Sequence, residues 1–396
     1  MKTNTKLTFV SFEQGCNSLI DHFLSQGYAF VFFKEPNTNE VYFLASSKPE
    51  QLSHPQIATE KRSGYLAAPF RENQKTSVFI PADIHFQCNL SDDKLSWLPL
   101  NPESSELDIR KTTKPRYSKL AKSFKQPDII ENQSYTELVK SAQNLIKDGL
   151  IEKVAVCRNK NIKLNVFPDL GNLYDKICTD YPAAMCVLYY HPDYGLWMGA
   201  SPELLVSEHN GVFKTVALAG TKPDTGESTA QIAWSQKEIE EQAMVSRYII
   251  DQFKKIRLRE FKESGPKTVR AGNVMHLKTE YTVDTAEVAV NNLTLTMLEL
   301  LHPTSAVGGM PRAEALNFLL EYELLDRSLY TGYWGPVNIS SKLAFYVNLR
   351  CVMLYEESAL FFAGAGITAA SDPESEFRET ELKMNSLAAY FNTDDE

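Results

Sequence analysis

Apolar and polar residues alternate along the chain in two periods, one typical of short strands and one of amphipathic helices. Before residue 100, strand-like runs are predicted at residues 28–33, 41–45 and 77–80, and a helix is predicted at residues 16–25. Residues 101–125 are polar and contain prolines, which is typical of a linker.

After this linker the pattern becomes richer in helices. The predicted helices cover residues 134–147, 235–254, 293–301, 311–322 and 374–391. The predicted strands cover residues 153–157, 185–190, 195–208, 212–219, 267–271 and 275–283 and several runs within 335–364, and residues 220–227 are predicted to be a loop. Because short turns join most neighbouring strands, we expect an α+β fold of largely antiparallel sheets with helices packed outside.

Two pairs of glutamates, Glu238 with Glu241 and Glu376 with Glu379, have i,i+3 spacing on two of the predicted helices. Each pair shares a helical stripe with residues that prefer burial, since side chains three and four apart lie on one face. For either pair alone, a surface position or an ion pair is the simpler interpretation. Two such pairs on inward stripes favour a shared partner, because an unpaired buried charge is costly, and Mg²⁺ prefers carboxylate ligands.

Two further charged residues lie within apolar strands. Lys153 has Ala155 and Cys157 on its own face, and poor hydration there would lower its pKa, as a general base requires. The alternative is a lysine at a strand end that extends to water. Glu203 follows Ser201-Pro202 at a bend in an apolar run, where it would act as an acid with a raised pKa or as a turn-capping or ion-paired residue.

The glycines of residues 364–369 resemble a dinucleotide fingerprint, but no helix follows them directly. Such glycines also allow an anionic ligand to approach the backbone, which is the interpretation we favour. No HExxH, Walker or GxSxG motif is present, and His276 and His302 are isolated, so the sequence does not predict a zinc site.

Composition indicates a globular protein without a nucleic-acid partner. The 396 residues carry a net charge of −9, and the one basic-rich stretch, residues 110–125, lacks an aromatic ladder, so a solvated linker is favoured over RNA binding. The six cysteines are scattered without a CxxC, which is typical of reduced thiols. We find no signal-like N-terminus and no apolar run that could span a bilayer, and therefore expect a cytoplasmic location without membrane contact.

A set of motifs occurs in order through the second half of the chain. They are SPEL at 201–204, LAGT at 218–221, KEIEE at 237–241, VMHL at 274–277, LHPT at 301–304, VGGMPR at 307–312, DRSLYTG at 326–332 and GAGI at 364–367, followed by Lys383. Together they closely resemble the chorismate-utilising enzymes, which include anthranilate, aminodeoxychorismate, isochorismate and salicylate synthases. The resemblance covers about residues 134–391, and the part before the linker matches only loosely.

The resemblance implies two facing antiparallel sheets with outer helices and an active site in the cleft with one Mg²⁺. Residues 1–125 would be the N-terminal part of this fold with its linker, and residues 126–396 the chorismate-binding catalytic region. By matched motif, Glu241 and Glu376 would be the main metal ligands, while Glu238 and Glu379 would act directly or through water. The metal would hold the ring carboxylate of chorismate.

The remaining expected site residues bind the substrate. Arg350 and Tyr330 match the family's binders of the enolpyruvyl carboxylate, for which an arginine fork is well suited. The pocket would also be lined by Thr221, His276, Gly364, Gly366 and Lys383.

Two positions divide the family. Ammonia-using anthranilate-type enzymes carry glutamine where this chain has Lys153, and aminodeoxychorismate synthases carry a nucleophilic lysine where it has Ala219. The resemblance therefore implies a water-using isochorismate synthase, an isomerase in which Lys153 deprotonates a water that attacks C2 and Glu203 protonates the departing C4 hydroxyl. No glutaminase subunit would be needed.

Three departures from the family pattern bear on the subfamily rather than on the class. Gln242 stands where histidine is frequent, Ser305 replaces a frequent proline, and Lys222-Pro223-Asp224 replaces the usual proline-arginine. The nearest alternative is a salicylate synthase, which also eliminates pyruvate. An ammonia-using synthase and a catalytically silent binding protein remain further alternatives. Isochorismate feeds menaquinone or siderophore and salicylate biosynthesis, and both pathways stay open here.

Overall fold

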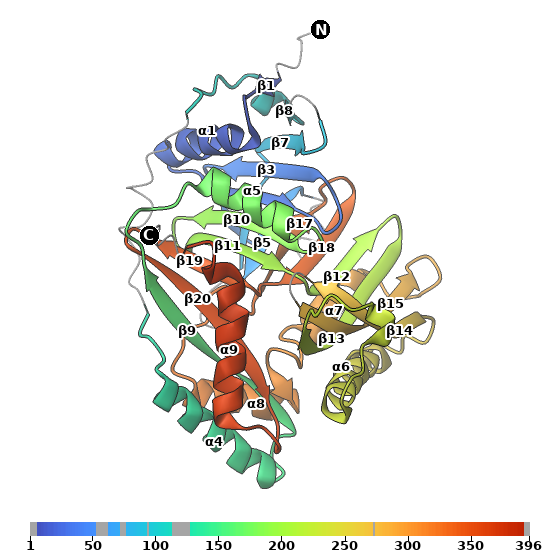
Figure 1. Cartoon of the computed structure of the whole chain (residues 1–396). Coiled ribbons are helices and arrows are strands. Elements are labelled where there is room, and N and C mark those ends of the chain that lie inside the picture. Colours follow the sequence, from blue (N-terminus) through green and yellow to red (C-terminus); the bar gives the residue numbers. More distant parts are fainter. Residues whose placement is uncertain are drawn as a thin grey trace.

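The computed structural model describes residues 6–52, 62–71, 77–92, 95–112, 127–271 and 274–391. Two antiparallel sheets dominate this part of the chain (Figure 1). The first contains β1 (Leu7–Thr8), β2 (Ala29–Lys34), β3 (Glu40–Ser46), β7 (Ile84–Asn89), β8 (Ser96–Pro99), β9 (Lys153–Lys163), β10 (Met185–His191), β11 (Gly195–Ser201), β16 (Gly309–Met310), β19 (Cys351–Tyr355) and β20 (Ser358–Ile367). The second contains β4 (Glu50–Gln51), β5 (Gly64–Ala68), β6 (Val78–Pro81), β12 (Leu204–His209), β13 (Val212–Pro223), β14 (Lys262–Ala271), β15 (Val274–Asp284), β17 (Tyr333–Val337) and β18 (Lys342–Val347).

The strand orders are β1-β8-β7-β3-β2-β10-β11-β19-β20-β9-β16 and β14-β15-β13-β12-β18-β17-β5-β6-β4. The main helices are α1 (Phe12–Ser25), α4 (Asn132–Lys147), α5 (Leu170–Asp180), α6 (Gln236–Lys255), α7 (Leu293–Leu301), α8 (Arg312–Tyr322) and α9 (Pro373–Ala388). In Figure 1, α1, α5, α4 and α9 accompany the first sheet, whereas α6 and α7 accompany β12–β15 of the second. The predicted fold of antiparallel sheets with outer helices is confirmed.

Strand β2 illustrates why some apolar runs are continuous rather than alternating. Val31 and Phe33 lie in the core between the sheets with Tyr65 of β5, while Phe30 and Phe32 lie in the core beneath α1 and α5. Both faces of this strand are therefore covered, so both of its side-chain sets are apolar.

Two of the points where the chain crosses from one sheet to the other are neighbours. Strands β11 and β12 belong to different sheets, as do β18 and β19. The two crossing segments are hydrogen-bonded to the flanking strands: the Val347 amide donates to the Glu203 carbonyl, and the Ala200 amide donates to the Arg350 carbonyl, both at 3.0 Å. Glu203 and Arg350 are thus held where the two sheets meet.

Several element predictions need correction. The single strand predicted at residues 195–208 is two strands, because the bend at Pro202 directs the chain into the second sheet. The loop predicted at residues 220–227 is wrong at its start, since β13 continues to Pro223, with Lys222 paired to Met275 after a bulge. Helix α1 begins at Phe12, where the Ser11 side chain caps it by accepting from the Gln14 amide.

The predicted linker is only partly described. Residues 113–126 lie outside the described residues, and residues 102–105 form the short helix α3 (Pro102–Ser105) with Asn101 as its N-cap. Within the described ranges, no helix is both long and apolar enough to cross a membrane.

Candidate active site

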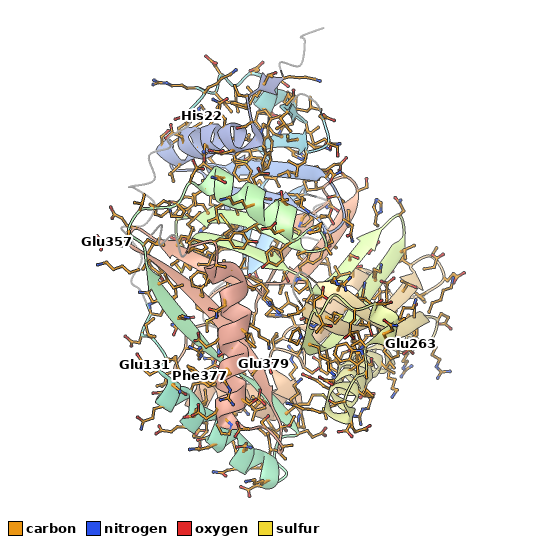
Figure 2. The ribbon with its side chains drawn as sticks, viewed as in Figure 1. His22, Glu131, Glu263, Glu357, Phe377 and Glu379 are labelled. Atoms are coloured by element: carbon orange, nitrogen blue, oxygen red, sulfur yellow. The ribbon has the colours of Figure 1, made fainter. Side chains whose placement is uncertain are left out.

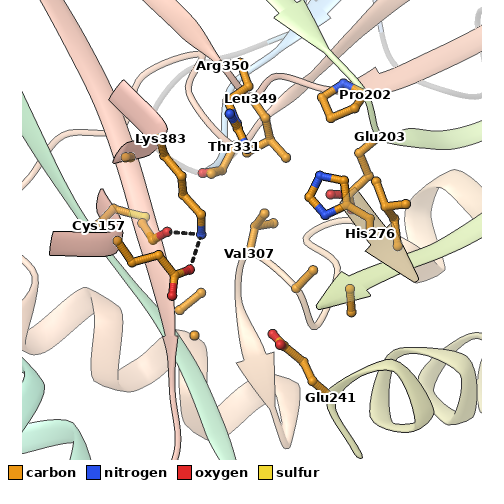
Figure 3. Close-up of a pocket in the computed structure, with 18 of the residues that line it drawn as sticks. Cys157, Pro202, Glu203, Glu241, His276, Val307, Thr331, Leu349, Arg350 and Lys383 are labelled. Carbon is orange, nitrogen blue, oxygen red and sulfur yellow. Dashed lines mark hydrogen bonds and ion pairs between the residues drawn. The ribbon is translucent and has the colours of Figure 1, made fainter. Parts of the chain in front are cut away.

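A cavity of about 240 Å³ lies between the end of the first sheet and helix α6 of the second. Residues from β9, β20 and α9 form one wall, and residues from β13, β15 and α6 form the other (Figure 3). The β11–β12 and β18–β19 crossings both reach the cavity. The predicted site residues that line it are Glu203, Glu238, Glu241, His276, Tyr330, Arg350, Gly364, Gly366, Glu379 and Lys383. Segments far apart in the sequence therefore meet at one small pocket.

Lys153 is the first residue of β9 and is only 2% exposed. Its Nζ lies 2.8 Å from Oε1 of Glu241 on α6, so the ion pair joins the two walls. The side chain crosses over Gly366 on β20, where an added Cβ would lie 2.6 Å from the Lys153 Cε. The glycine is required for this close approach.

Glu203 is 7% exposed and faces the cavity from the crossing between β11 and β12 (Figure 3). Burial raises the pKa of its carboxyl to about 7, although the Lys153 ammonium acts in the opposite direction. A carboxyl with this pKa still carries a proton in a useful fraction of molecules near neutral pH, as a general acid must.

Because the Glu203 carboxyl is buried, we expect Glu203→Gln to be more stable than the wild type, by an amount that depends on pH. The carboxyl keeps its proton up to a pH of about 7 in the folded chain but only to 4.5 when unfolded, so folding loses stability as pH rises through this window. Removing the ionisable group should raise the free energy of unfolding by about 1–3 kcal/mol at pH 8. Urea unfolding at pH 5 and pH 8 tests this: the gain must be small at pH 5, and a gain that does not grow with pH would contradict the assignment.

Lys383 and Glu379 lie on one face of α9, directed at the cavity. The Lys383 Nζ lies 2.7 Å from the Glu379 carboxylate and donates to the Gly364 carbonyl at 2.9 Å (Figure 3). Figure 2 places Glu379 on the side of α9 that faces the second sheet and Phe377 on the side of α4, where it contacts Tyr135. The helix thus presents its polar stripe to the cavity and an apolar contact to the core.

Three of the expected substrate binders have well-defined surroundings. The neutral His276 imidazole donates from Nδ1 to the Gly220 carbonyl at 2.8 Å, and burial lowers the pKa of His276 to about 4. Tyr330 is buried and stacks on Phe362, with ring centroids 5.4 Å apart. The Arg350 backbone has a φ of +48°, and its Nη1 donates to the Ser386 hydroxyl at 3.3 Å.

The four glutamates are each directed at a lysine. The pairs are Glu241 with Lys153 at 2.8 Å, Glu379 with Lys383 at 2.7 Å, Glu376 with Lys237 at 3.6 Å and Glu238 with Lys222 at 3.8 Å. Although burial opposes the change, Lys153 lowers the pKa of Glu241 and Lys383 lowers the pKa of Glu379. Burial raises the pKa of Glu376. Both glutamate pairs therefore sit in lysine-rich surroundings, as the ion-pair interpretation of the sequence allows.

The cavity differs from the expected site in three positions. Lys153 and Glu376 lie just behind the cavity and are not among the described residues that line it. The Thr221 side chain lies outside the described part of the chain. The sequence did not single out Cys157, Lys237, Val307 or Thr331, which line the cavity. Lys237, Val307 and Thr331 did carry a signal, because they belong to the KEIEE, VGGMPR and DRSLYTG motifs.

The sequence was compared with protein-family models and with known proteins, and the matches agree with one another. Residues 70–392 match the family model described as chorismate binding enzyme. The chain is 28% identical over 331 residues to the isochorismate synthase EntC of Escherichia coli, which covers 82% of this chain and 80% of the relative. It is 26% identical over 268 residues to the isochorismate synthase MenF of Bacillus subtilis, which covers 65% and 55%.

Solved structures share the fold. The menaquinone-specific isochorismate synthase MenF of Escherichia coli superposes with a TM-score of 0.75 at 19% identity over 98% of this chain and 94% of its own. Anthranilate synthase component I of Streptococcus pneumoniae superposes with a TM-score of 0.65 at 16% identity over 91% and 92%. The two-sheet architecture is therefore common to these chains.

Proposed function

This chain belongs to the family of chorismate binding enzymes, and we propose that it is an isochorismate synthase, an isomerase that acts on chorismate with the help of Mg²⁺. The observation that carries the proposal is that a buried acid, Glu203, lines the cavity while a buried lysine, Lys153, lies just behind it. Ala219, which lines the same cavity, stands where aminodeoxychorismate synthases carry a nucleophilic lysine. Relatives named isochorismate synthase support the assignment.

The proposed reaction needs one base and one acid. Lys153, as the neutral amine, takes a proton from a water whose oxygen forms a bond to C2 of chorismate. The ring double bonds shift, the C4–O bond breaks, and Glu203 donates the proton that makes the departing hydroxyl a water. One water enters and one leaves, so the net reaction is an isomerisation. Burial raises the pKa of Glu203 to about 7, which suits the acid. The Glu241 carboxylate beside Lys153 favours its ammonium form, so Lys153 must lose that proton to solvent before it can act as the base.

Substrate carboxylates would meet the cationic and donor groups of the cavity. Arg350 supplies a guanidinium at the sheet crossing and Tyr330 a hydroxyl beside it, which suits the enolpyruvyl carboxylate. Lys383 is held by Gly364 and Glu379, so its ammonium is already oriented before substrate enters.

The carboxylates fit Mg²⁺ by their donor chemistry. Glu238, Glu241 and Glu379 line the cavity, Glu376 lies behind it, and oxygen ligands of this kind suit a hard divalent cation. Within the ranges that the structure describes, no three Asp, Glu, His or Cys side chains converge as a ligand set, because each carboxylate is turned toward a lysine. A bound Mg²⁺ would hold the ring carboxylate of chorismate and neutralise charge there.

Product analysis tests the proposal. Purified protein incubated with chorismate and Mg²⁺ should give isochorismate as the main product, without pyruvate and without a requirement for ammonium. Stoichiometric pyruvate would instead indicate a salicylate synthase, and ammonium-dependent anthranilate an ammonia-using enzyme. Because water is the nucleophile, we propose that the enzyme needs no glutaminase subunit. We also propose that it works in the cytoplasm, as expected from the sequence.

A further inference from the structure

The four glutamates of the proposed metal site are already balanced by positive charge from the chain itself. Each has one lysine within 4.0 Å, so four carboxylates face four ammonium groups. A divalent cation that enters must compete with these internal counter-ions for the same oxygens. This inference rests on the proposed function, because it concerns the metal that the reaction would use.

Lys222 differs from the other three lysines in its surroundings. It lies at the end of β13, its Nζ donates to the Ala233 carbonyl at 2.6 Å, and it sits over the Trp234 ring at 5.5 Å. It is not among the described residues that line the cavity. These contacts hold its ammonium 3.8 Å from the Glu238 carboxylate and outside the lining of the cavity.

Glu238 is held in a second way by its own helix. Its Oε2 accepts from the Ser235 amide at 2.6 Å and from the Ser235 hydroxyl at 2.5 Å, which completes a capping box at the start of α6. Lys222 approaches the same oxygen. Both contacts keep this oxygen turned toward the helix N-terminus, away from Glu241 one turn later.

The backbone beside Glu238 leaves little room for adjustment. Gly220 has a φ of +68°, and an added Cβ would lie 3.3 Å from both the Glu238 Cβ and the Trp234 ring. Trp234 is itself fixed, since its Nε1 donates to the Thr268 hydroxyl at 2.9 Å. The neighbours of Glu238 on this side are thus closely packed, and Lys222 is held beside them by its contacts with Ala233 and Trp234.

We propose that Lys222 sets the affinity of the site for its divalent cation, by competing for Glu238 and by adding positive charge beside the ligands. Lys222→Met removes both effects, and the site should bind the cation more tightly. Because the pair is partly exposed to solvent, the gain should be about two- to fivefold in Kd. The gain should shrink at high ionic strength, as screening weakens the Lys222 charge.

The binding test uses Mn²⁺ as the probe, with the free ion counted by electron paramagnetic resonance and Mg²⁺ as competitor. The full-length wild type, Lys222→Met and a second variant, Lys222→Gln, are compared with Lys214→Met. Lys214 lies on the same strand with similar exposure and pairs with Glu280 at 2.8 Å, but it is about 25 Å from Lys222 along the strand. We expect lower Kd values for both Lys222 variants and an unchanged Kd for Lys214→Met.

The outcomes separate this inference from the proposed function. Equal or weaker Mn²⁺ binding in both Lys222 variants would overturn the inference, even if the wild type makes isochorismate. Tighter binding in those variants would support it, even if product analysis rejected an isochorismate synthase. A wild type that binds no Mn²⁺ would overturn the inference and the proposed metal dependence together.

Discussion

Replacing Lys153 by methionine should reduce kcat for isochorismate formation about 10²–10⁴-fold, which is the usual contribution of a positioned general base. Methionine has a similar length and keeps the packing over Gly366 but cannot take a proton from water. Steady-state kinetics with chorismate and saturating Mg²⁺ measures the loss, and KM should change much less than kcat.

Two variants give this experiment its controls. Lys160 lies on the same strand and pairs with Glu381 at 2.8 Å, and Lys160→Met should keep nearly full activity. Lys153→Arg keeps the positive charge next to Glu241 but cannot act as a base near neutral pH, so it should remain inactive. If Lys153→Met retained activity within a few-fold of the wild type, or if Lys153→Arg were active, Lys153 would not be the base.

The largest effect on stability is expected at a buried ion pair next to the cavity. Arg327 and Glu323 are each 1% exposed in their side chains, with the Arg327 Nε 2.6 Å from the Glu323 carboxylate. Arg327 also donates to the carbonyls of Ala155 at 2.7 Å and Val307 at 2.8 Å. Glu323 accepts from the Cys157 amide at 2.9 Å. One ion pair thus anchors three cavity-lining residues.

Arg327→Met should lower the free energy of unfolding by about 3–5 kcal/mol, because it leaves the Glu323 charge buried without a partner. Urea unfolding measures this loss. The double variant Arg327→Met, Glu323→Leu should recover part of it, since both charges are then gone but the Ala155 and Val307 carbonyls and the Cys157 amide lose these partners. The exposed pair of Lys254 and Asp251, also at 2.8 Å, is the control, and Lys254→Met should change stability by less than about 1 kcal/mol. Equal losses for Arg327→Met and Lys254→Met would contradict this account.

The fold was predictable from sequence wherever a strand or helix has a periodic apolar face. The amphipathic pattern of residues 374–391 agrees with α9 to within a few residues. The division of residues 195–208 was not predictable, because β11 and β12 are both largely buried and read as one apolar run. Which sheet a strand joins depends on long-range pairing, for which a local pattern has no signal.

The site was predictable in its residue types but not in its pairing. Helical spacing identified Glu238 and Glu241, and motif order linked them to the acids of α9. The partners of Glu238, Glu241 and Glu376 come from other segments, as in the ion pair of Lys153 with Glu241. Such contacts arise only when distant segments fold against each other, so these partners could not be derived from local sequence. The pair of Glu379 with Lys383 is the exception, because its i,i+4 spacing on α9 is visible in the sequence.

The central claim is that this cavity activates a water against C2 of chorismate, with Lys153 as the base. Incubation in H₂¹⁸O with chorismate and Mg²⁺, followed by mass spectrometry of the product, tests this most directly. The account predicts isochorismate that carries one ¹⁸O at its new C2 hydroxyl, and no such product from Lys153→Met. Isochorismate without the label, or labelled isochorismate formed equally well by Lys153→Met, would contradict it.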